Sequence, residues 1–229
     1  MNQPQIRDFQ GKHIHMIGIG GSSMSGLAEL LVKEGYHVSG SDRSNGYALE
    51  KLRKLGVTVH VGHAPENVHG ADLVVYTAAI LPDNPERVEM ERLGLPNMER
   101  AELLGQLMEG YAQAVGVCGT HGKTTTTSML SQILVECGKD PTVHIGGQLD
   151  AIGGSTRIGH GDTFLAEACE FKASFHHMHP TMAVVTNIEE DHLDFYKDID
   201  DIQASFRRFL GLLPPWGICL LYTSDAADD

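Results

Sequence analysis

Two segments of this chain have the order apolar strand, glycine loop and helix, and this order limits the fold more than any other feature. The first runs from the strand-like residues 13–19 through the loop GIGGSSMSG into a helix predicted at 23–35. The second runs from residues 112–119 through the loop GTHGKT into a helix predicted at 123–138. A glycine loop between a buried strand and a helix N-terminus is typical of α/β folds that bind phosphate groups.

Further strands and helices alternate around these two segments, and such alternation specifies a parallel sheet with helices on its faces. The pattern restarts near Gly110. We therefore predict an α/β chain with a Rossmann-like parallel-sheet N-terminal domain at 1–110, followed by the first part of a P-loop ATPase-type α/β domain at 111–215. The other predicted strands are 36–42, 57–62, 71–80, 162–168 and 181–188, and the other predicted helices are 47–56 and a pair within 82–110.

The end of the sequence departs from this pattern. In PPWGICLLYTSDAADD the alternation stops, and the last residues show neither helical nor strand periodicity. We predict that the natural protein differs from this sequence beyond about Pro215, and that residues 216–229 are a non-native tail. An ordinary frayed terminus is the alternative.

Charge and composition narrow the class of partner. The chain has 17 basic and 30 acidic residues, a net charge of −13, and its longest basic run is Arg207-Arg208, which disfavours nucleic acid. No segment has the run of about 18 apolar residues that a membrane helix needs, so membrane insertion is not expected. The four cysteines form no CxxC pair, which argues against a zinc ribbon or a disulfide framework and favours a cytoplasmic protein.

The first loop matches the dinucleotide fingerprint in part. Gly18 and Gly20 have the expected spacing, and Asp42 ends the next predicted strand, but Ser23 occupies the third glycine position. The fingerprint favours an NAD site with the acid at a ribose. Free N–H groups at a helix start bind any diphosphate, including that of a UDP-sugar, and a tight turn without a ligand is a further alternative.

The second loop is a variant P-loop. Lys123 has the length to reach the β and γ phosphates of a nucleotide, and the Thr124 hydroxyl can ligate Mg²⁺. The strict P-loop pattern has glycine where this chain has Val117, so the glycine spacing is shorter here. The strand and helix on either side nevertheless favour a nucleotide site.

Metal ligands are expected at the ends of two later strands. Glu167 and Glu170 end one strand, and His192 follows another; such donors suit Mg²⁺ or Mn²⁺. The HHMH run (residues 176–179) is interpreted as a surface or domain contact rather than a zinc site. A helical stripe after the P-loop is predicted to be core: Met129, Leu130, Ile133 and Leu134.

Five motifs in order resemble those of the Mur ligases, the ligases of peptidoglycan synthesis. They are HMIGIGGSSMSGLAELL, GYHVSGSD, GTHGKTTTTSML, DPTVHIGG and AVVTNIEEDHLDFY, and the resemblance extends from about His13 to Pro215. Within the family the motifs look most like those of the ligase that joins L-alanine to UDP-N-acetylmuramate.

The resemblance implies two phosphate sites with different ligands. The first loop is expected to bind the diphosphate of UDP-N-acetylmuramate, with the uridine end at Asp42 and His63 and the sugar facing His121. The second loop is expected to bind ATP with Mg²⁺ (or Mn²⁺) held by Thr124, Glu167 and His192; these three and Lys123 are the expected catalytic residues. The diphosphate contacts are Gly20, Gly21, Ser22, Ser23 and Met24, and the ATP contacts are Gly119, Thr120, His121, Gly122, Lys123, Thr124 and Thr125.

The reaction implied by the resemblance is ATP-dependent amide formation. The γ-phosphoryl group passes to the lactyl carboxylate of UDP-N-acetylmuramate, and the amine of L-alanine attacks the resulting acyl phosphate. The family has a third, amino-acid-binding domain that this sequence lacks, so the chain is expected to be inactive alone. It also departs from the family at Cys169 and Lys172, where aspartate is usual, which puts the geometry of the metal site in doubt.

Three other functions are consistent with the same residues. A murein-recycling ligase attaches a tripeptide to the same UDP-sugar, and the choice of amino-acid substrate distinguishes it. A non-catalytic module would bind two nucleotides, NAD and ATP, and NAD binding without UDP-sugar binding would favour it. A P-loop kinase is the third, although the sequence shows no separate catalytic base or lid.

Overall fold

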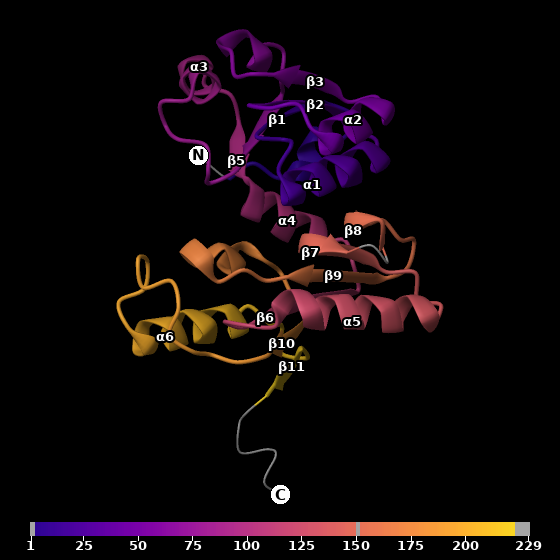
Figure 1. Cartoon of the computed structure of the whole chain (residues 1–229), viewed down its shortest axis with the longest axis vertical. Coiled ribbons are helices and arrows are strands. Elements are labelled where there is room, and N and C mark those ends of the chain that lie inside the picture. Colours follow the sequence, from indigo (N-terminus) through magenta and orange to yellow (C-terminus); the bar gives the residue numbers. More distant parts are fainter. Residues whose placement is uncertain (1–2, 150–151, 223–229) are drawn as a thin grey trace, which may run out of the picture. The chain divides into compact units, whose positions relative to one another are not determined.

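The protein was analysed as a computed structural model that describes residues 3–149 and 152–222 (Figure 1). The chain divides into two compact units, Met1–Leu104 and Gly105–Asp229, each with its own sheet. The α/β class predicted from the alternation is confirmed. No helix within the described ranges is both long and apolar enough to span a bilayer.

The first unit is built on a five-stranded sheet in which every neighbouring pair is parallel. The central strand is completely buried at Ile14, Met16 and Ile17, because it has a partner strand on each side and helices over both faces. The strand order is β3-β2-β1-β4-β5, with bounds β1 His13–Ile17, β2 His37–Asp42, β3 Thr58–Val61, β4 Leu73–Tyr76 and β5 Asn97–Glu99.

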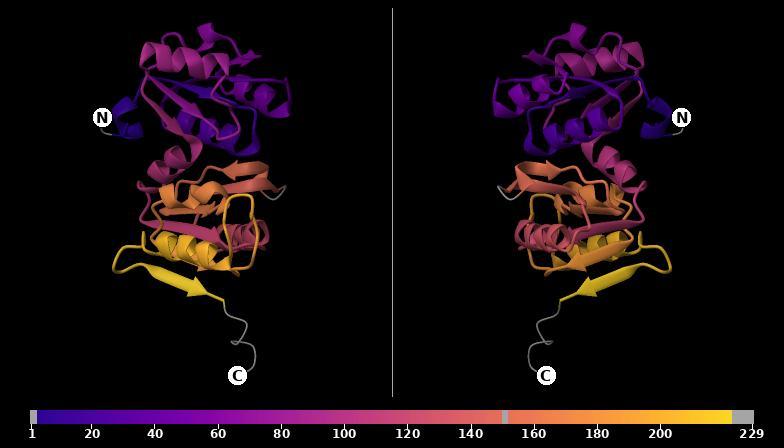
Figure 2. Two further views of the ribbon diagram at one scale, coloured as in Figure 1. Left: turned by 90° about the vertical axis from the view of Figure 1, so that its left-hand side faces the viewer. Right: turned by 90° about the vertical axis from the view of Figure 1, so that its right-hand side faces the viewer.

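The helices of the first unit lie on both faces of this sheet. Helices α1 and α2 lie side by side on one face, and α3 lies on the other with the short 3-10 helix η2 (Figure 2). The apolar face predicted for α1 is buried as expected, at Met24, Leu27, Ala28 and Leu31. The bounds are η1 Ile6–Phe9, α1 Ser22–Lys33, α2 Tyr47–Lys54, η2 Pro65–Val68 and α3 Pro85–Leu93. Helix α4, Arg100–Met108, begins in the first unit and ends in the second.

The second unit has a six-stranded sheet of order β11-β10-β6-β9-β7-β8, parallel except for the antiparallel pair β7-β8. Helix α5 packs on β6, β7 and β9, and α6 packs on the 3-10 helix η4, where Phe175 stacks on Phe209. The bounds are β6 Gln113–Cys118, α5 Lys123–Glu136, β7 Thr142–Leu149, β8 Gly154–Arg157, β9 Thr163–Glu167, η4 Phe171–His177, β10 Met182–Val185, α6 Ile199–Leu210 and β11 Ile218–Leu221.

The apolar stripe on α5 is not a single core face. Leu130 and Leu134 pack on the core of the second unit, but Met129 and Ile133 are 54% and 58% exposed. Successive helical residues differ by about 100° in direction, so neighbours such as 129 and 130 need not share a face. The prediction that all four residues are core is therefore wrong for Met129 and Ile133.

Strand β11 lies inside the segment predicted to be a tail. It pairs in parallel with β10, from Ile218 opposite Met182 to Leu221 opposite Val185, so the sheet continues past Pro215. All four residues of β11 are exposed, and main-chain pairing is what joins the strand to the sheet. That residues 216–229 are non-native stays a prediction.

Helix α3 begins at a side-chain cap that can be tested. The Asn84 side-chain oxygen accepts hydrogen bonds from the N–H groups of Glu86 and Arg87, at 2.9 and 3.4 Å. We expect Asn84→Ala to lower the free energy of unfolding by about 1 kcal/mol, because it leaves these donors uncapped. Asp83→Ala, at the exposed neighbouring position, is the control and should change it by less than about 0.5 kcal/mol. Equal losses in urea titrations of the two variants would contradict the cap assignment.

Candidate functional site

The first glycine loop is held by the end of the neighbouring strand. The N–H groups of Gly18 and Ile19 both donate to the Ser41 carbonyl near the end of β2, at 2.8 and 3.0 Å. Gly18 has φ of 82°, a left-handed conformation that favours glycine. These contacts turn the chain sharply from β1 into α1, so the helix begins directly beside the sheet edge.

Asp42 secures this loop from the side. One of its carboxylate oxygens accepts a hydrogen bond from the Gly20 N–H at 2.9 Å. A Cβ on Gly20 would lie 2.8 Å from the Asp42 carboxyl carbon, so glycine is what allows this approach. The acid predicted to face a ribose therefore also fixes the loop that is predicted to bind the diphosphate.

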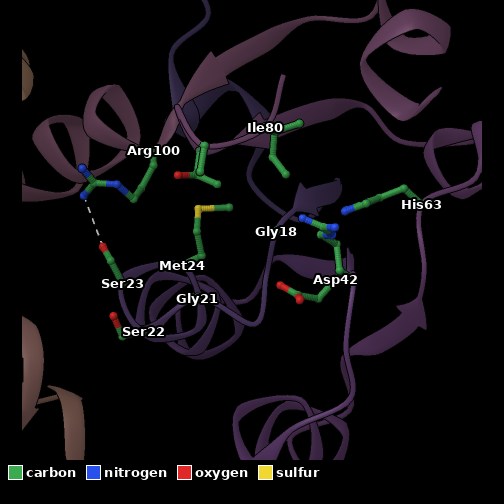
Figure 3. Close-up of a pocket in the computed structure, with 12 residues that line it drawn as sticks. Gly18, Gly21, Ser22, Ser23, Met24, Asp42, His63, Ile80 and Arg100 are labelled. Atoms are coloured by element: carbon green, nitrogen blue, oxygen red, sulfur yellow. Dashed lines mark hydrogen bonds between the residues drawn. The ribbon is translucent and has the colours of Figure 1, made fainter. Parts of the chain in front are cut away.

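A cavity of about 390 Å³ opens at this edge of the sheet, within the size range of small-molecule sites (Figure 3). Five residues of the predicted UDP-sugar set besides Asp42 line it: Gly21, Ser22, Ser23, Met24 and His63. The N–H group of Gly20 donates to Asp42, which lines the cavity. The remaining lining residues are Gly18, Arg43, Thr77, Ala79, Ile80 and Arg100.

Two arginines in this cavity were not predicted. Arg100, the first residue of α4, donates from Nη1 to the Ser23 hydroxyl at 3.2 Å across the mouth of the glycine loop (Figure 3). Arg43 lines the same cavity, so the residues that line it include two arginines and one acid, Asp42. This balance favours an anionic ligand in a chain whose net charge is −13. Arg100 follows β5, a strand of three residues that is too short to show periodicity, so no sequence pattern pointed to it.

A buried carboxylate lies behind the cavity wall. Glu86 on α3 is fully buried and accepts hydrogen bonds from the side chains of Ser41 and Asn67, each at 2.5 Å. Its Oε2 lies 3.6 Å from His15 Nε2. Burial opposes ionisation of Glu86, but its contacts with His15, Ser41 and Asn67 outweigh this effect and lower the pKa of the carboxyl to about 2. Burial also lowers the pKa of His15, against the pull of Glu86.

The second glycine loop is held in the same manner by the residues that follow β10. The Thr120 N–H donates to the Asn187 carbonyl at 3.1 Å, and the His121 N–H donates to the Asn187 side-chain oxygen at 2.9 Å. Gly119 has φ of 140°, and a Cβ there would lie 2.0 Å from the Thr186 hydroxyl. The GTHGKT and TNIEEDHLDFY motifs, about 65 residues apart, therefore form one structure.

Lys123 lies over this loop and contacts a buried acid. Its Nζ donates to the carbonyls of Gly119 and Thr120, at 2.6 and 3.1 Å, and to Glu170 Oε1 at 2.8 Å. Glu170 is 3% exposed, and the same oxygen lies 3.6 Å from His192 Nε2. The structure thus brings Lys123, Glu170 and His192 together, with His192 in the left-handed region at φ 51°.

The residues predicted to hold a metal have donor chemistry that suits Mg²⁺. Oε1 of Glu167 and Oε2 of Glu170 are buried and have no hydrogen-bond partner in the described part of the chain. The Thr124 side chain is exposed at the start of α5, and its methyl group approaches Gly147. The preceding residue, Gly146, faces the Glu167 carboxylate. Oxygen donors of this kind fit a hard cation, although no group of three or more His, Cys, Asp or Glu residues within the described ranges is gathered closely enough to hold one.

The remaining predicted residues lie in the second unit. His121 is two-thirds exposed, and its Nε2 lies 4.0 Å from Glu189; its expected contact with the sugar stays a prediction. Thr125 is exposed on the first turn of α5. In the HHMH run, the His176 ring stacks on Phe175 and contacts the Ser205 carbonyl, so it is engaged within the unit.

Both units match models of one protein family, and this match agrees with the fold and the two glycine loops. Residues 13–112 match "Mur ligase family, catalytic domain", and residues 117–228 match "Mur ligase middle domain". The chain belongs to the Mur ligase family.

The chain is also similar to individual members of the family. The chain is 54% identical over 218 residues to a UDP-N-acetylmuramate--L-alanine ligase of Acetivibrio thermocellus, covering 95% of this chain and 46% of that protein. The structure of the UDP-N-acetylmuramate-alanine ligase of Thermotoga maritima is similar, with a TM-score of 0.83, 30% identity and coverage of 94% and 50%. A ligase of Neisseria meningitides, named for UDP-N-acetylmuramate and L-alanyl-gamma-D-glutamyl-meso-diaminopimelate, has a TM-score of 0.85, 31% identity and coverage of 95% and 74%. The chain spans about half the length of the curated relatives it matches.

The contact between Gly20 and Asp42 can be tested with two neighbouring glycines. We expect Gly20→Ala to lower the free energy of unfolding by about 1–2 kcal/mol, because the new methyl group displaces Asp42 from the loop N–H. Gly21→Ala is the matched control, since a Cβ there meets no atom closer than 3.5 Å. Thermal and urea unfolding of both variants measure the difference. A Gly21 variant as unstable as the Gly20 variant would contradict the assignment.

Proposed function

We propose that this chain is the UDP-sugar-binding and ATP-binding part of a ligase that joins L-alanine to the lactyl carboxylate of UDP-N-acetylmuramate. The observation that carries the proposal is the pair of glycine loops, one in each unit. The first opens into a cavity with two arginines, and the second carries a lysine paired with a buried glutamate. Two phosphorylated substrates account for two phosphate-binding loops in one chain.

The first cavity would hold UDP-N-acetylmuramate. The diphosphate would lie at the N-terminus of α1, where the residues from Gly20 to Met24 offer N–H groups and the helix dipole favours negative charge. Arg100 and Arg43 would add charge-assisted hydrogen bonds to the phosphate oxygens. In a doubly wound sheet the nucleoside lies toward the ends of the next strands, which places uridine at Asp42 and His63.

The second loop would hold ATP. The N–H groups of residues 119–125 would surround the phosphates. The Lys123 ammonium group would leave the loop carbonyls and contact the β and γ phosphates instead. Thr124, Glu167 and His192 would hold Mg²⁺ or Mn²⁺, with Glu170 beside them. When bound, such a cation neutralises negative charge on the phosphoryl group during transfer. Glu170 and the residues after β10 keep the lysine and loop in place.

The chain spans about half the length of the curated relatives it matches, and we propose a function for this part. We propose that residues 1–110 bind the UDP-sugar and 111–215 form part of the ATP-binding domain, and that the amino acid is bound by the part of the relatives outside this match. The chain alone would then bind both phosphorylated substrates without completing amide formation, as a part of a cytoplasmic enzyme. Positioning of the carboxylate against the γ phosphate supplies most of the rate in such transfers.

A tripeptide-adding ligase is the second candidate, because the Neisseria structure named for such a substrate has a similar TM-score. The 54% identity to an alanine-adding relative favours L-alanine. A non-catalytic module would bind NAD rather than a UDP-sugar in the first cavity. Titration of the chain with both ligands distinguishes this function from that of a ligase.

The reaction itself is tested by phosphate release. We expect the natural full-length protein to release phosphate from ATP when UDP-N-acetylmuramate and L-alanine are both present, and this 229-residue chain to release none. Release by the full-length protein with the tripeptide but not with L-alanine would support the second candidate. Turnover by the 229-residue chain would overturn its proposed inactivity.

The assignment of one ligand to each unit is tested by two variants of this chain. We expect Arg100→Ala to weaken UDP-N-acetylmuramate binding by about tenfold or more, because it removes charge-assisted hydrogen bonds, and to leave Mg·ATP binding unchanged. Lys123→Met should weaken Mg·ATP binding and leave UDP-N-acetylmuramate binding unchanged. Isothermal titration of both ligands against both variants, with thermal unfolding as the check on folding, measures this. Weakening of both ligands by both variants would contradict the assignment.

A further inference from the structure

Glu86 ties together the segments that form one wall of the cavity. It is fully buried, and besides Ser41 at the end of β2 it holds the segment that follows β3. Its Oε1 accepts hydrogen bonds from the Asn67 side chain and from the Ala64 N–H, the latter at 3.3 Å. His63, directly before Ala64, is thereby fixed between Glu86 and the cavity.

The two ring nitrogens of His63 have different surroundings. Nδ1 lies 3.1 Å from the Ser41 hydroxyl and 3.4 Å from Glu86 Oε2. Nε2 is buried and has no hydrogen-bond partner within the described ranges. The side chain lines the cavity and is directed toward it in Figure 3. A buried ring nitrogen without a partner loses hydrogen bonding to water, and a ligand that fills the cavity can restore it.

The hydrogen bonds around Glu86 determine which nitrogen of His63 carries the proton. The carboxylate of Glu86 accepts hydrogen bonds and cannot donate, because its low pKa keeps it ionised. Ser41 has one hydroxyl hydrogen and donates it to Glu86, so toward His63 it can act as an acceptor. Both neighbours of Nδ1 are therefore acceptors, and Nδ1 must carry the hydrogen. In the neutral imidazole, Nε2 is then a bare acceptor.

We propose that Glu86, acting with Ser41, is a positioning residue that makes Nε2 of His63 the acceptor for a ring N–H of the base of the bound nucleoside diphosphate. This inference rests on the proposed function, in which the first cavity holds a UDP-sugar. Uracil carries an N–H at ring position 3, whereas cytosine has a lone pair at that position. An acceptor at Nε2 therefore selects uracil, and contacts to the phosphates do not distinguish the two bases.

The selectivity is tested first on the unmodified 229-residue chain. We expect UDP to bind at least about tenfold more tightly than CDP in isothermal titration at about pH 8. Equal affinities would overturn this inference and leave the proposed function standing. If UDP does not bind at all, both the inference and the proposed role of the cavity are overturned.

The tautomer is tested separately by nitrogen NMR. The ¹⁵N shifts of the His63 ring, assigned by comparison with His63→Asn, should show the hydrogen on Nδ1. In Glu86→Gln the amide can donate toward this ring, so we expect a larger Nε2–H population and a preference for UDP over CDP that falls to about threefold or less. A purely structural role for Glu86 would weaken UDP and CDP equally.

A matched control lies on the same helix. Glu89 contacts a different histidine, His69, at 2.8 Å, so Glu89→Gln should alter the shifts of His69 and leave the UDP preference unchanged. If Glu86→Gln does not fold, the shifts and affinities of the unmodified chain still decide the matter. Hydrogen on Nε2 of His63 in that chain would overturn the inference.

Discussion

In both units, main-chain hydrogen bonds from a glycine loop to the end of a neighbouring parallel strand hold the site together. In the first unit the loop N–H groups donate to the Ser41 carbonyl, and in the second the Thr120 N–H donates to the Asn187 carbonyl. The carboxyl ends of parallel strands meet at one edge of a sheet, so each loop finds a fixed acceptor there. The helix that follows each loop then starts with its N–H groups directed at that edge.

Two buried carboxylates support these loops from behind. Burial of each carboxylate would cost free energy without the groups that donate to it. Glu86 is surrounded by hydroxyl, amide and imidazole groups from four segments of the first unit, and these contacts outweigh burial to lower its pKa to about 2. Glu170 pairs with Lys123 and approaches His192 in the second unit. In both cases the acid lies behind a glycine loop and contacts residues distant in sequence, which helps to keep the shape of this part of the unit.

The local order of strand, loop and helix could be predicted because it depends on residues close together in the sequence. The strands at 13–19, 36–42 and 112–119 and the helices that follow both loops were confirmed. Strand β5, the β7-β8 hairpin and helix α6 were not predicted. Strand β5 has three residues, and the hairpin carries polar and glycine residues, so neither shows a clear period.

The sequence by itself determined the α/β class, the two glycine loops and the lysine and threonine of the second loop, because backbone turns and short motifs are local. It also supplied the five ordered motifs of the Mur ligases. The tertiary structure decided which distant side chains join each loop: Arg100 and Glu86 at the first, Glu170 and Asn187 at the second. Those contacts depend on strand order and register, which bring residues up to about 80 positions apart to one sheet edge. Neither charge nor periodicity indicates which side chain such a residue will contact, since a buried carboxylate and a solvated one have the same letter in a sequence.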